Sequence, residues 1–424
     1  MSARFDTLAE ALAYQQGVHG RTIDLGLERV REVGARLGLL DKYCPVAIVG
    51  GTNGKGSTAC SLAAFLAACG YRVGLFTSPH LVRYNERVQI NGTPVDDAAL
   101  LRAFGLIEDA RGSITLTFFE YNTLAALEIF RQAGVSSMVL EVGLGGRLDA
   151  TNIIDADVAL LCSVGVDHRD WLGDTLEQIG AEKAGIFRPG QPVVLGSAAM
   201  PASVWQQAAA LQCRLYSAGR EFSVRVDAGG RWNYTSELCR LDGLPAAALA
   251  GEVQYHNAAA ALTALNLLGA RGACELARIA QGLRAVHLPG RFQRVPGEVE
   301  WILDVAHNEP AAAVLAAALQ AQPVEGRTYA VLGLLADKDA TSVARVLDTV
   351  VDHWLLAALD DEPRGLSAEA LQARLPSLRG AIECCGRVPD ACARARALAR
   401  PRDRVVVLGS FHVVGPALTW LGLY

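Results

Sequence analysis

The stretch VAIVGGTNGKGST, from Val46 to Thr58, joins a run of small apolar residues to glycines, a lysine and two hydroxyl side chains. In a strand–loop–helix context, glycines let backbone N–H groups approach an anion, and the following helix points the positive end of its dipole at that anion. Lys55 adds a charge for the terminal phosphates, and the hydroxyls after it can reach a metal. The spacing departs from GxxxxGK[ST], because Val49 replaces the first glycine and Gly56 follows Lys55. The stretch predicts a phosphate-binding loop, with a plain glycine-rich turn as the alternative.

Around this stretch, short apolar runs alternate with helical patterns from about Tyr43 to Gly196. Such alternation predicts a mostly parallel sheet covered by helices on both faces. Residues of about 220–250 indicate a short antiparallel insert, and the alternation restarts after the hinge HLPGRFQRVPGE. We therefore expect an α/β protein with a larger domain over residues 1–287, a smaller Rossmann-like domain over 288–424, and a cleft between them for a two-substrate reaction.

Composition narrows the classes of function. The 424 residues are 51% hydrophobic and 20% charged, with a formal net charge of -5, which indicates a globular protein and no basic surface for nucleic acids or membranes. The N-terminus lacks the basic start and apolar run of a secretory signal. Ten scattered cysteines without a CxxC pair argue against zinc and against a disulfide framework. A cytoplasmic protein is expected.

Four classes of protein could use a phosphate loop. A switch GTPase needs a base-reading NKxD motif, but the nearest string, ADKD, lacks the asparagine. A dehydrogenase needs GxGxxG, whereas GLGGRL carries Leu148 in the third glycine's place. A non-catalytic nucleotide-binding module would not require the second α/β domain. An ATP-dependent ligase or kinase remains.

Other polar residues near strand ends or on helices are less specific when taken alone. Glu141 ends the apolar strand MVLEVG, where P-loop proteins place a carboxylate on magnesium, although a surface role is the alternative. Asp167 and His168 end another strand, VGVDH, where a structural histidine is the alternative. By its spacing alone, Lys183 in AEKAGIF is a solvated helix lysine.

The string GTNGKGS resembles the ATP loop of the Mur ligase superfamily and, with Gly56, that of folylpolyglutamate synthases. Further matches follow in order: DLGLERV, TSPHLVRYNERVQING, FFEYNTLAALEIF, EVGLGGRLDATNI, DHRDWLG, EKAGIF, LPGRFQ, DVAHN, LGLLADKD and GSFH. The chain is thus similar to the bifunctional dihydrofolate synthase/folylpolyglutamate synthase family. The resemblance implies an N-terminal P-loop-type ATPase domain and a C-terminal Rossmann-like ligase domain. Glu309, where the family usually has proline, removes no ligand.

The resemblance also implies an activity. Such an enzyme is an ATP-dependent amide ligase that adds L-glutamate to dihydropteroate, and to the glutamyl tail of reduced folates, through an acyl phosphate. ATP, two Mg²⁺ ions and carbon dioxide, as a carbamate on Lys183, would be its cofactors. Its partners would be these small molecules, without nucleic acid or membrane, and it would be a monomer. A Mur-type ligase acting on another carboxylic acid is the alternative.

Site residues carry over from the family by motif. The resemblance assigns the ATP phosphates and adenosine to Thr52, Asn53, Gly54, Lys55, Gly56, Ser57 and Asn257, with Arg291, Asp304 and His307 from the second domain. It assigns metal binding to Ser78, Glu141, His168 and Lys183, and catalysis to Lys55, Glu141, His168 and Lys183. It assigns the pterin end to Thr22, Ile23, Asp24, Leu25, Thr117, Phe118, Phe119, Glu120, Leu148, Asp149 and Ala150. An interdomain ion-pair network is the alternative for the second-domain trio, and a core position is the alternative for the phenylalanines.

Overall fold

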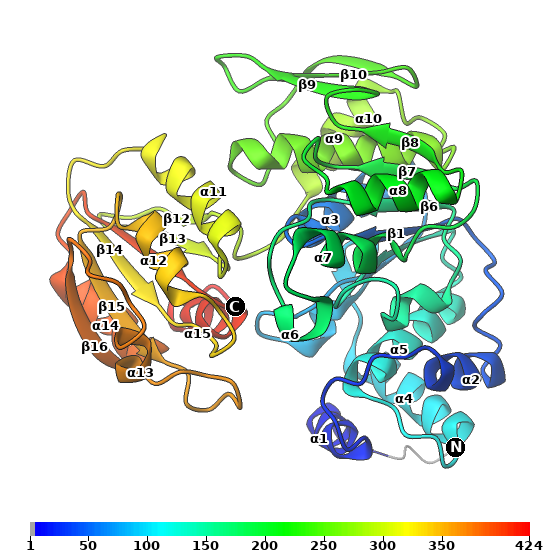
Figure 1. Cartoon of the computed structure of the whole chain (residues 1–424), viewed down its shortest axis with the longest axis horizontal. Coiled ribbons are helices and arrows are strands. Elements are labelled where there is room, and N and C mark those ends of the chain that lie inside the picture. Colours follow the sequence, from blue (N-terminus) through cyan, green and yellow to red (C-terminus); the bar gives the residue numbers. More distant parts are fainter. Residues whose placement is uncertain (1–4) are drawn as a thin grey trace. The chain divides into compact units, whose positions relative to one another are not determined.

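The computed structural model describes residues 5–424, and the chain forms two compact units (Figure 1). The N-terminal unit comprises the chain up to Pro79, Asn85–Ala248 and Gln254–His287. The C-terminal unit comprises Leu288–Tyr424 and two short segments from earlier in the chain, His80–Tyr84 and Leu249–Val253. Within residues 5–424, no helix is long and apolar enough to cross a bilayer.

The N-terminal unit is built on an eight-stranded sheet. In sheet order its strands are β4 (Thr93–Pro94), β3 (Val88–Ile90), β2 (Val73–Phe76), β5 (Ser137–Glu141), β1 (Val46–Gly50), β6 (Val158–Leu161), β7 (Pro192–Leu195) and β8 (Arg214–Ser217). From β2 to β8 all neighbours are parallel, whereas β3 and β4 add an antiparallel edge. The expected mostly parallel sheet is confirmed. β1 lies between β5 and β6 and is parallel to both. The segments that follow these three strands therefore lie next to one another, at the end of the sheet where the strands have their carboxyl ends.

Helices of this unit surround the sheet. They are α1 (Leu8–Val18), α2 (Glu28–Arg36), α3 (Lys55–Ala68), α4 (Asp97–Arg111), α5 (Phe118–Ala133), α6 (Arg169–Leu172), α7 (Leu176–Ala184), α8 (Ala202–Ala210), α9 (Glu252–Leu267) and α10 (Leu276–Ala285), with short 3₁₀ turns η1 (Tyr84–Arg87) and η2 (Ala150–Ile153). Small residues let α3 pack closely, and ten of its 14 residues are buried. A Cβ on Gly282 of α10 would lie 2.7 Å from the Phe65 ring, so glycine at that position allows these two helices to approach closely.

The insert expected at about 220–250 is present as a three-stranded antiparallel sheet in the order β11-β10-β9. Its strands are β9 (Phe222–Val226), β10 (Trp232–Ser236) and β11 (Arg240–Leu244). Phe222, Trp232 and Tyr234 are buried on it. The Tyr234 hydroxyl lies 2.9 Å from the Thr263 hydroxyl and thereby ties the insert to α9.

The C-terminal unit has a six-stranded sheet in the order β12-β13-β17-β14-β15-β16, parallel except for the β12 edge. Its strands are β12 (Gln293–Val295), β13 (Glu300–Asp304), β14 (Thr328–Leu332), β15 (His353–Ala358), β16 (Ala381–Arg387) and β17 (Arg404–Leu408). Its helices are α11 (Glu309–Gln320), α12 (Ala340–Leu347), α13 (Ala368–Gln372), α14 (Val388–Leu398) and α15 (Phe411–Trp420). The expected C-terminal α/β domain is confirmed.

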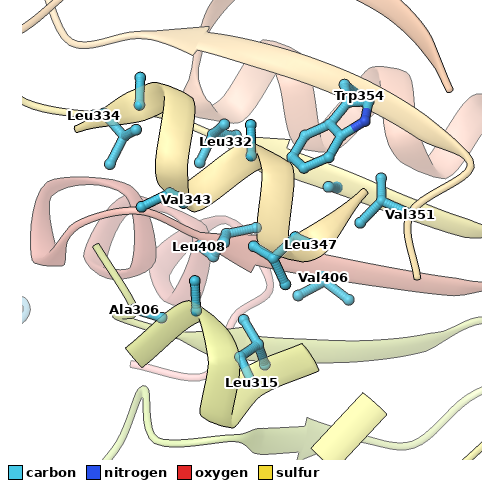
Figure 2. Packing of buried hydrophobic residues seen from close by; sticks show 14 of the residues in the cluster. Ala306, Leu315, Leu332, Leu334, Val343, Leu347, Val351, Trp354, Val406 and Leu408 are labelled. Carbon is cyan, nitrogen blue, oxygen red and sulfur yellow. The ribbon is translucent and has the colours of Figure 1, made fainter. Parts of the chain in front are cut away.

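Neighbouring residues of these strands enter different hydrophobic clusters, as the alternation of side chains along a strand requires. Leu332 and Val406 pack with Leu315 of α11 and Leu347 of α12 (Figure 2). Val407, the neighbour of Val406, belongs to a second cluster formed with α14 and α15. Helices therefore cover both faces of the C-terminal sheet.

Candidate active site

The predicted phosphate loop is the connection between β1 and α3. Gly51 has a φ of 145° and Gly54 a φ of 87°, conformations that favour glycine. A Cβ on Gly54 would lie 2.8 Å from Oδ1 of Asn257, so a side chain there would strike α9. Gly54 is also the N-cap of α3, and Lys55 is the first residue of that helix. The loop therefore leads directly into the N-terminus of a buried helix. The first N–H groups of a helix have no carbonyl partner within the helix, so this end can bind an anion.

The segment that follows β6 holds this loop in place. The Thr52 N–H donates to the carbonyl of Ser163 at 2.8 Å, and the Asn53 N–H donates to the Ser163 hydroxyl at 3.0 Å. The Thr52 hydroxyl accepts from the Gly165 N–H at 2.9 Å. Sequence reasoning missed Ser163, although its place just after a strand next to β1 was an available signal. These bonds fix the loop before any ligand arrives.

Two lysines meet at the loop. Nζ of Lys55 donates to the carbonyl oxygens of Gly51 and Thr52, each at 3.0 Å, and Nζ of Lys183 donates to the same Gly51 oxygen at 3.0 Å. Lys183 is only 5% exposed, which overturns the solvated-lysine alternative. Burial, and next the positive charge of Lys55, lower the pKa of Lys183 to about 7, against the opposing influence of Asp167. Near neutral pH a large fraction of this amine is therefore uncharged.

Glu141 is a buried carboxylate at the carboxyl end of β5. Its Oε2 accepts a hydrogen bond from the Ser78 N–H at 3.1 Å, so the structure brings together the residues that end β5 and follow β2. The hydroxyl of Ser78 and the carboxylate of Glu141 are hard oxygen donors, the type that Mg²⁺ prefers. The pair fits part of a magnesium site. Within the described part of the chain, no group of three His, Cys, Asp or Glu side chains is arranged to hold a metal.

Cys162 joins these groups into one site. It follows β6, and its buried thiol lies within electrostatic range of Lys55, Glu141 and Lys183. Its Sγ donates to the Thr58 hydroxyl at 3.3 Å. Burial raises the pKa of Cys162 to about 11, so the thiol stays protonated beside the loop. Nothing in the sequence singled out Cys162.

His168 adopts a left-handed conformation, with a φ of 52°, at the start of α6. Its Nε2 lies 4.0 Å from Oδ2 of Asp167, and the Asp167 carboxylate accepts the His168 N–H at 2.9 Å. The side chain is 35% exposed. The imidazole is thus accessible and paired with a carboxylate, which suits either a ligand or a structural role.

The segments expected to bind the pterin end come together in space. Arg29 pairs with Asp24 at 2.6 Å and with Glu120 at 3.2 Å, which joins the segment 22–25 to the segment 117–120. Thr117 and Glu120 also form the capping box of α5. These two residues therefore have a structural role whatever they bind.

Asp149, in the third segment, is fully buried and shapes the preceding loop. It accepts from the N–H groups of Gly143 at 3.0 Å and Leu144 at 2.9 Å, and burial raises its pKa. Gly143 in turn packs against the Phe119 ring, where a Cβ would come within 2.5 Å. Phe119 therefore has a packing role, whatever else it contacts. Phe118 instead lies under the Arg87 guanidinium, 5.6 Å from the ring centre.

In the C-terminal unit, the three expected residues gather at the carboxyl end of β13. Asp304 accepts from the Phe292 N–H at 2.7 Å and the Ala306 N–H at 2.8 Å, and burial raises its pKa while the nearby Arg291 opposes that rise. The Arg291 guanidinium lies 5.3 Å from the centre of the Phe411 ring. Nδ1 of His307 is 2.8 Å from the Val305 carbonyl oxygen. A cation and an imidazole therefore lie near this half-buried carboxylate.

A phosphate loop with two lysines and a carboxylate, followed along the chain by a second α/β unit, is the architecture of an ATP-dependent ligase. Residues 49–265 match the Mur ligase middle domain, and residues 290–411 match the Mur ligase, glutamate ligase domain. The chain belongs to the Mur ligase family.

Relatives define the branch of that family. The chain is 45% identical to the dihydrofolate synthase/folylpolyglutamate synthase of Escherichia coli, over 96% of this chain and 94% of that protein. It is 39% identical to the protein of the same name from Haemophilus influenzae, over 96% of each. The resemblance to this branch of the family is confirmed, and the protein is an ATP-dependent ligase of that branch.

Solved structures agree with this placement. Escherichia coli FolC in complex with DHPP and ADP superposes with a TM-score of 0.93 at 43% identity, covering 98% of both chains. A bifunctional folylpolyglutamate synthase/dihydrofolate synthase with Mn, AMPPNP and L-glutamate bound has a TM-score of 0.90 at 43% identity, covering 99% of this chain and 98% of the other. The fold is therefore that of the family throughout the chain.

Proposed function

We propose that the protein joins the amino group of L-glutamate to the carboxylate of dihydropteroate, giving dihydrofolate, and to the glutamyl tail of reduced folates. The observation that carries the proposal is the loop at Gly51, where Lys55 and Lys183 converge, with Glu141 and both lysines within electrostatic range of Cys162. Support comes from relatives named for both activities and from relatives' structures that contain DHPP, ADP, AMPPNP or L-glutamate.

The chemistry follows from the difficulty of the reaction. A carboxylate does not condense with an amine unaided, because hydroxide is a poor leaving group. Transfer of the terminal phosphoryl group of ATP to the carboxylate gives an acyl phosphate, and attack by the glutamate amine then expels phosphate. Such a transfer depends on alignment and on neutralisation of charge. In this proposal the loop from Thr52 to Ser57 aligns the phosphates, and Lys55 neutralises the charge that develops on the phosphate oxygens of the leaving ADP.

Metal ions fit the same site. Bound divalent ions would neutralise the phosphate oxygens and hold them in line for transfer. We assign the first ion to Ser78 and Glu141, and the second to Glu141 and His168. A related structure with Mn and AMPPNP supports metal-dependent nucleotide binding. Magnesium takes oxygen ligands more readily than imidazole, so His168 is the ligand with the weaker chemical match.

We propose that the amine of Lys183 reacts with carbon dioxide to form a carbamate. Carbon dioxide reacts with a neutral amine, and the pKa of Lys183, lowered to about 7 by burial, provides that form near neutral pH. The modification replaces a cation by an anionic oxygen donor in a site that also holds Lys55. It would remove the repulsion between the two amines.

Residues of both units complete the proposal. We assign residues 1–287 to ATP and folate binding and residues 288–424 to the ligase domain that contributes to the nucleotide site. Adenosine is assigned to Asn257, and further ATP contacts to Arg291, Asp304 and His307. The pterin end is assigned to Thr22, Ile23, Asp24, Leu25, Thr117, Phe118, Phe119, Glu120, Leu148, Asp149 and Ala150. We also propose a cytoplasmic monomer, which light scattering of the purified protein and fractionation of cells test.

One assay tests the proposed reaction. Purified protein is incubated with ATP, magnesium and radiolabelled L-glutamate, with dihydropteroate or tetrahydrofolate mono- or diglutamate as the acceptor. We expect labelled product with each acceptor and one ADP for each glutamate joined. Product with neither acceptor, but with another carboxylic acid, would contradict the proposal and favour a Mur-type ligase of different specificity.

A further inference from the structure

Cys239 and Cys274 meet at a junction within the N-terminal unit. Cys239 lies in the turn between β10 and β11, where its N–H donates to the Ser236 hydroxyl at 3.1 Å. Cys274 lies just before α10. Its Sγ is 3.8 Å from the carbonyl oxygen of Leu238, the residue before Cys239, and 3.2 Å from Oδ1 of Asn266. Two segments far apart in sequence thus present their cysteines to each other.

The two thiols are in contact but differ in accessibility. Cys274 is exposed, whereas Cys239 is buried, with 7% of its surface accessible. Burial, and then a hydrogen bond to the Cys274 thiol, raise the pKa of Cys239 to about 12. An accessible sulfur that a reagent can reach, next to a second sulfur, is the arrangement in which a mixed disulfide can be converted to an internal disulfide. Because the raised pKa keeps Cys239 protonated, this second step is faster at alkaline pH.

We propose that Cys239 and Cys274 are a redox-sensitive pair that closes into a reversible disulfide in the presence of a small-molecule disulfide such as oxidised glutathione. Cys274, as thiolate, attacks one sulfur of the reagent, which forms a mixed disulfide and releases one thiol. Cys239 then loses its proton and attacks the Cys274 sulfur, which releases the second thiol. The two cysteines lose two electrons, and the reagent gains them. Excess thiol reverses both steps.

The cross-link would join two parts of the N-terminal unit that lie outside the nucleotide loop. It ties the insert to the start of α10, and α10 packs against α3 at Gly282 and Phe65. A cross-link between segments far apart in sequence restricts the unfolded chain and stabilises the folded one. Because neither thiol belongs to the proposed site, the disulfide stabilises the unit without changing catalysis.

The test compares the reduced and the glutathione-oxidised protein by peptide mapping in a mass spectrometer and by thermal unfolding. We expect one linked peptide pair, containing Cys239 and Cys274 and lighter by two hydrogen atoms. We also expect a midpoint of thermal unfolding about 5 °C higher after oxidation. Failure to find the linked pair, a persistent glutathione adduct on Cys274 alone, or an unchanged midpoint would each overturn the proposal.

Matched variants make the result specific. Cys274→Ser replaces an exposed side chain, so it should fold normally and lose the oxidation-dependent shift. Cys239→Ser should keep the glutathione adduct on Cys274, because the second attack is impossible. Cys213→Ser, at a half-buried thiol of the same unit that donates to the Arg188 carbonyl, should retain the shift in full. A shift that survives in Cys274→Ser would overturn the assignment.

Discussion

Lys55 and Lys183 donate to one and the same oxygen, the carbonyl of Gly51, each from 3.0 Å. Two amines that share an acceptor in a buried site repel each other when both are protonated. Burial and the charge of Lys55 accordingly lower the pKa of Lys183. In the proposed reaction the two lysines would have different roles: Lys55 would supply charge to the phosphates, and Lys183 would be available as a neutral amine.

The first prediction concerns Lys55. Lys55→Ala removes the charge that balances the transferred phosphoryl group, and the turnover should fall by about 100-fold or more. The thermal unfolding midpoint should change little, because Lys55 donates only to backbone carbonyls of its own loop. Glutamate-dependent release of ADP measures the effect. Wild-type rates in the variant would disprove the role of the loop.

The second prediction concerns carbon dioxide and Lys183. Isotopically labelled bicarbonate should give a carbamate signal in the NMR spectrum of the wild-type protein, and Lys183→Ala should lack it. The signal should grow as the pH rises through about 7, because the neutral amine is the reactive form. Lys42→Ala, at an exposed lysine paired with Asp157, is the matched control and should keep the signal. Equal spectra for wild type and Lys183→Ala would refute the modification.

The third prediction concerns how the free energy of unfolding depends on pH in a buffer free of carbon dioxide. It follows from the lowered pKa of Lys183. Below about pH 7 Lys183 is protonated in both the folded and the unfolded chain, and the penalty for its burial is complete. Between about pH 7 and the unperturbed lysine pKa of about 10.4, the unfolded chain binds one more proton, so stability rises with pH by about 1.4 kcal/mol per unit. Thermal unfolding of wild type and Lys183→Met measures this. The variant should lack the rise, and parallel pH profiles would be inconsistent with a depressed pKa.

The fourth prediction concerns Gly54. Its φ of 87° and the 2.8 Å approach of a Cβ to Asn257 mean that Gly54→Ala strains the backbone and pushes against α9. ATP binding, measured by calorimetry, should weaken by about tenfold or more. Gly70→Ala is the matched control, because its φ of 92° carries similar strain, yet no atom lies within 4 Å of its Cβ. Normal ATP affinity in Gly54→Ala would show that the loop does not bind the phosphates.

The fifth prediction concerns Glu141. Glu141→Gln keeps an acceptor for the Ser78 N–H but loses the negative charge that attracts a divalent ion. The magnesium concentration for half-maximal activity should rise by about tenfold or more. Glu177→Gln, at an exposed carboxylate that accepts from the Ala202 and Ser203 N–H groups, provides the comparison and should behave as wild type. An unaltered magnesium requirement in Glu141→Gln would exclude the carboxylate as a metal ligand.

Much of the fold could be predicted from the sequence, because local rules act on single segments. The strand, loop and helix from Val46 to Ala68 follow from a short apolar run, glycines and a helical pattern. Gly70, with its positive φ just beyond α3, ends the helix as expected. The insert was foreseen at about 220–250 from its short alternating runs, and it forms β9, β10 and β11.

Other features depend on which segments meet, which spacing does not reveal. The burial of Lys183 and its bond to Gly51 arise because α7 returns to the β1 loop. His80–Tyr84 belongs to the C-terminal unit because Leu81 packs against the core of that unit. No local pattern in the sequence reveals this contact, because the core residues lie far along the chain. One local signal was overlooked: the T-x-x-E spacing of Thr117 and Glu120 is that of a capping box.

The central claim is that the site activates a carboxylate by phosphorylating it, and one isotope measurement tests this directly. Dihydropteroate with a heavy oxygen isotope in its carboxylate is converted with ATP and L-glutamate, and the released phosphate is analysed by mass spectrometry. An acyl phosphate requires that each phosphate carry one heavy oxygen from the substrate. Phosphate without the heavy isotope, alongside normal amide formation, would contradict the account.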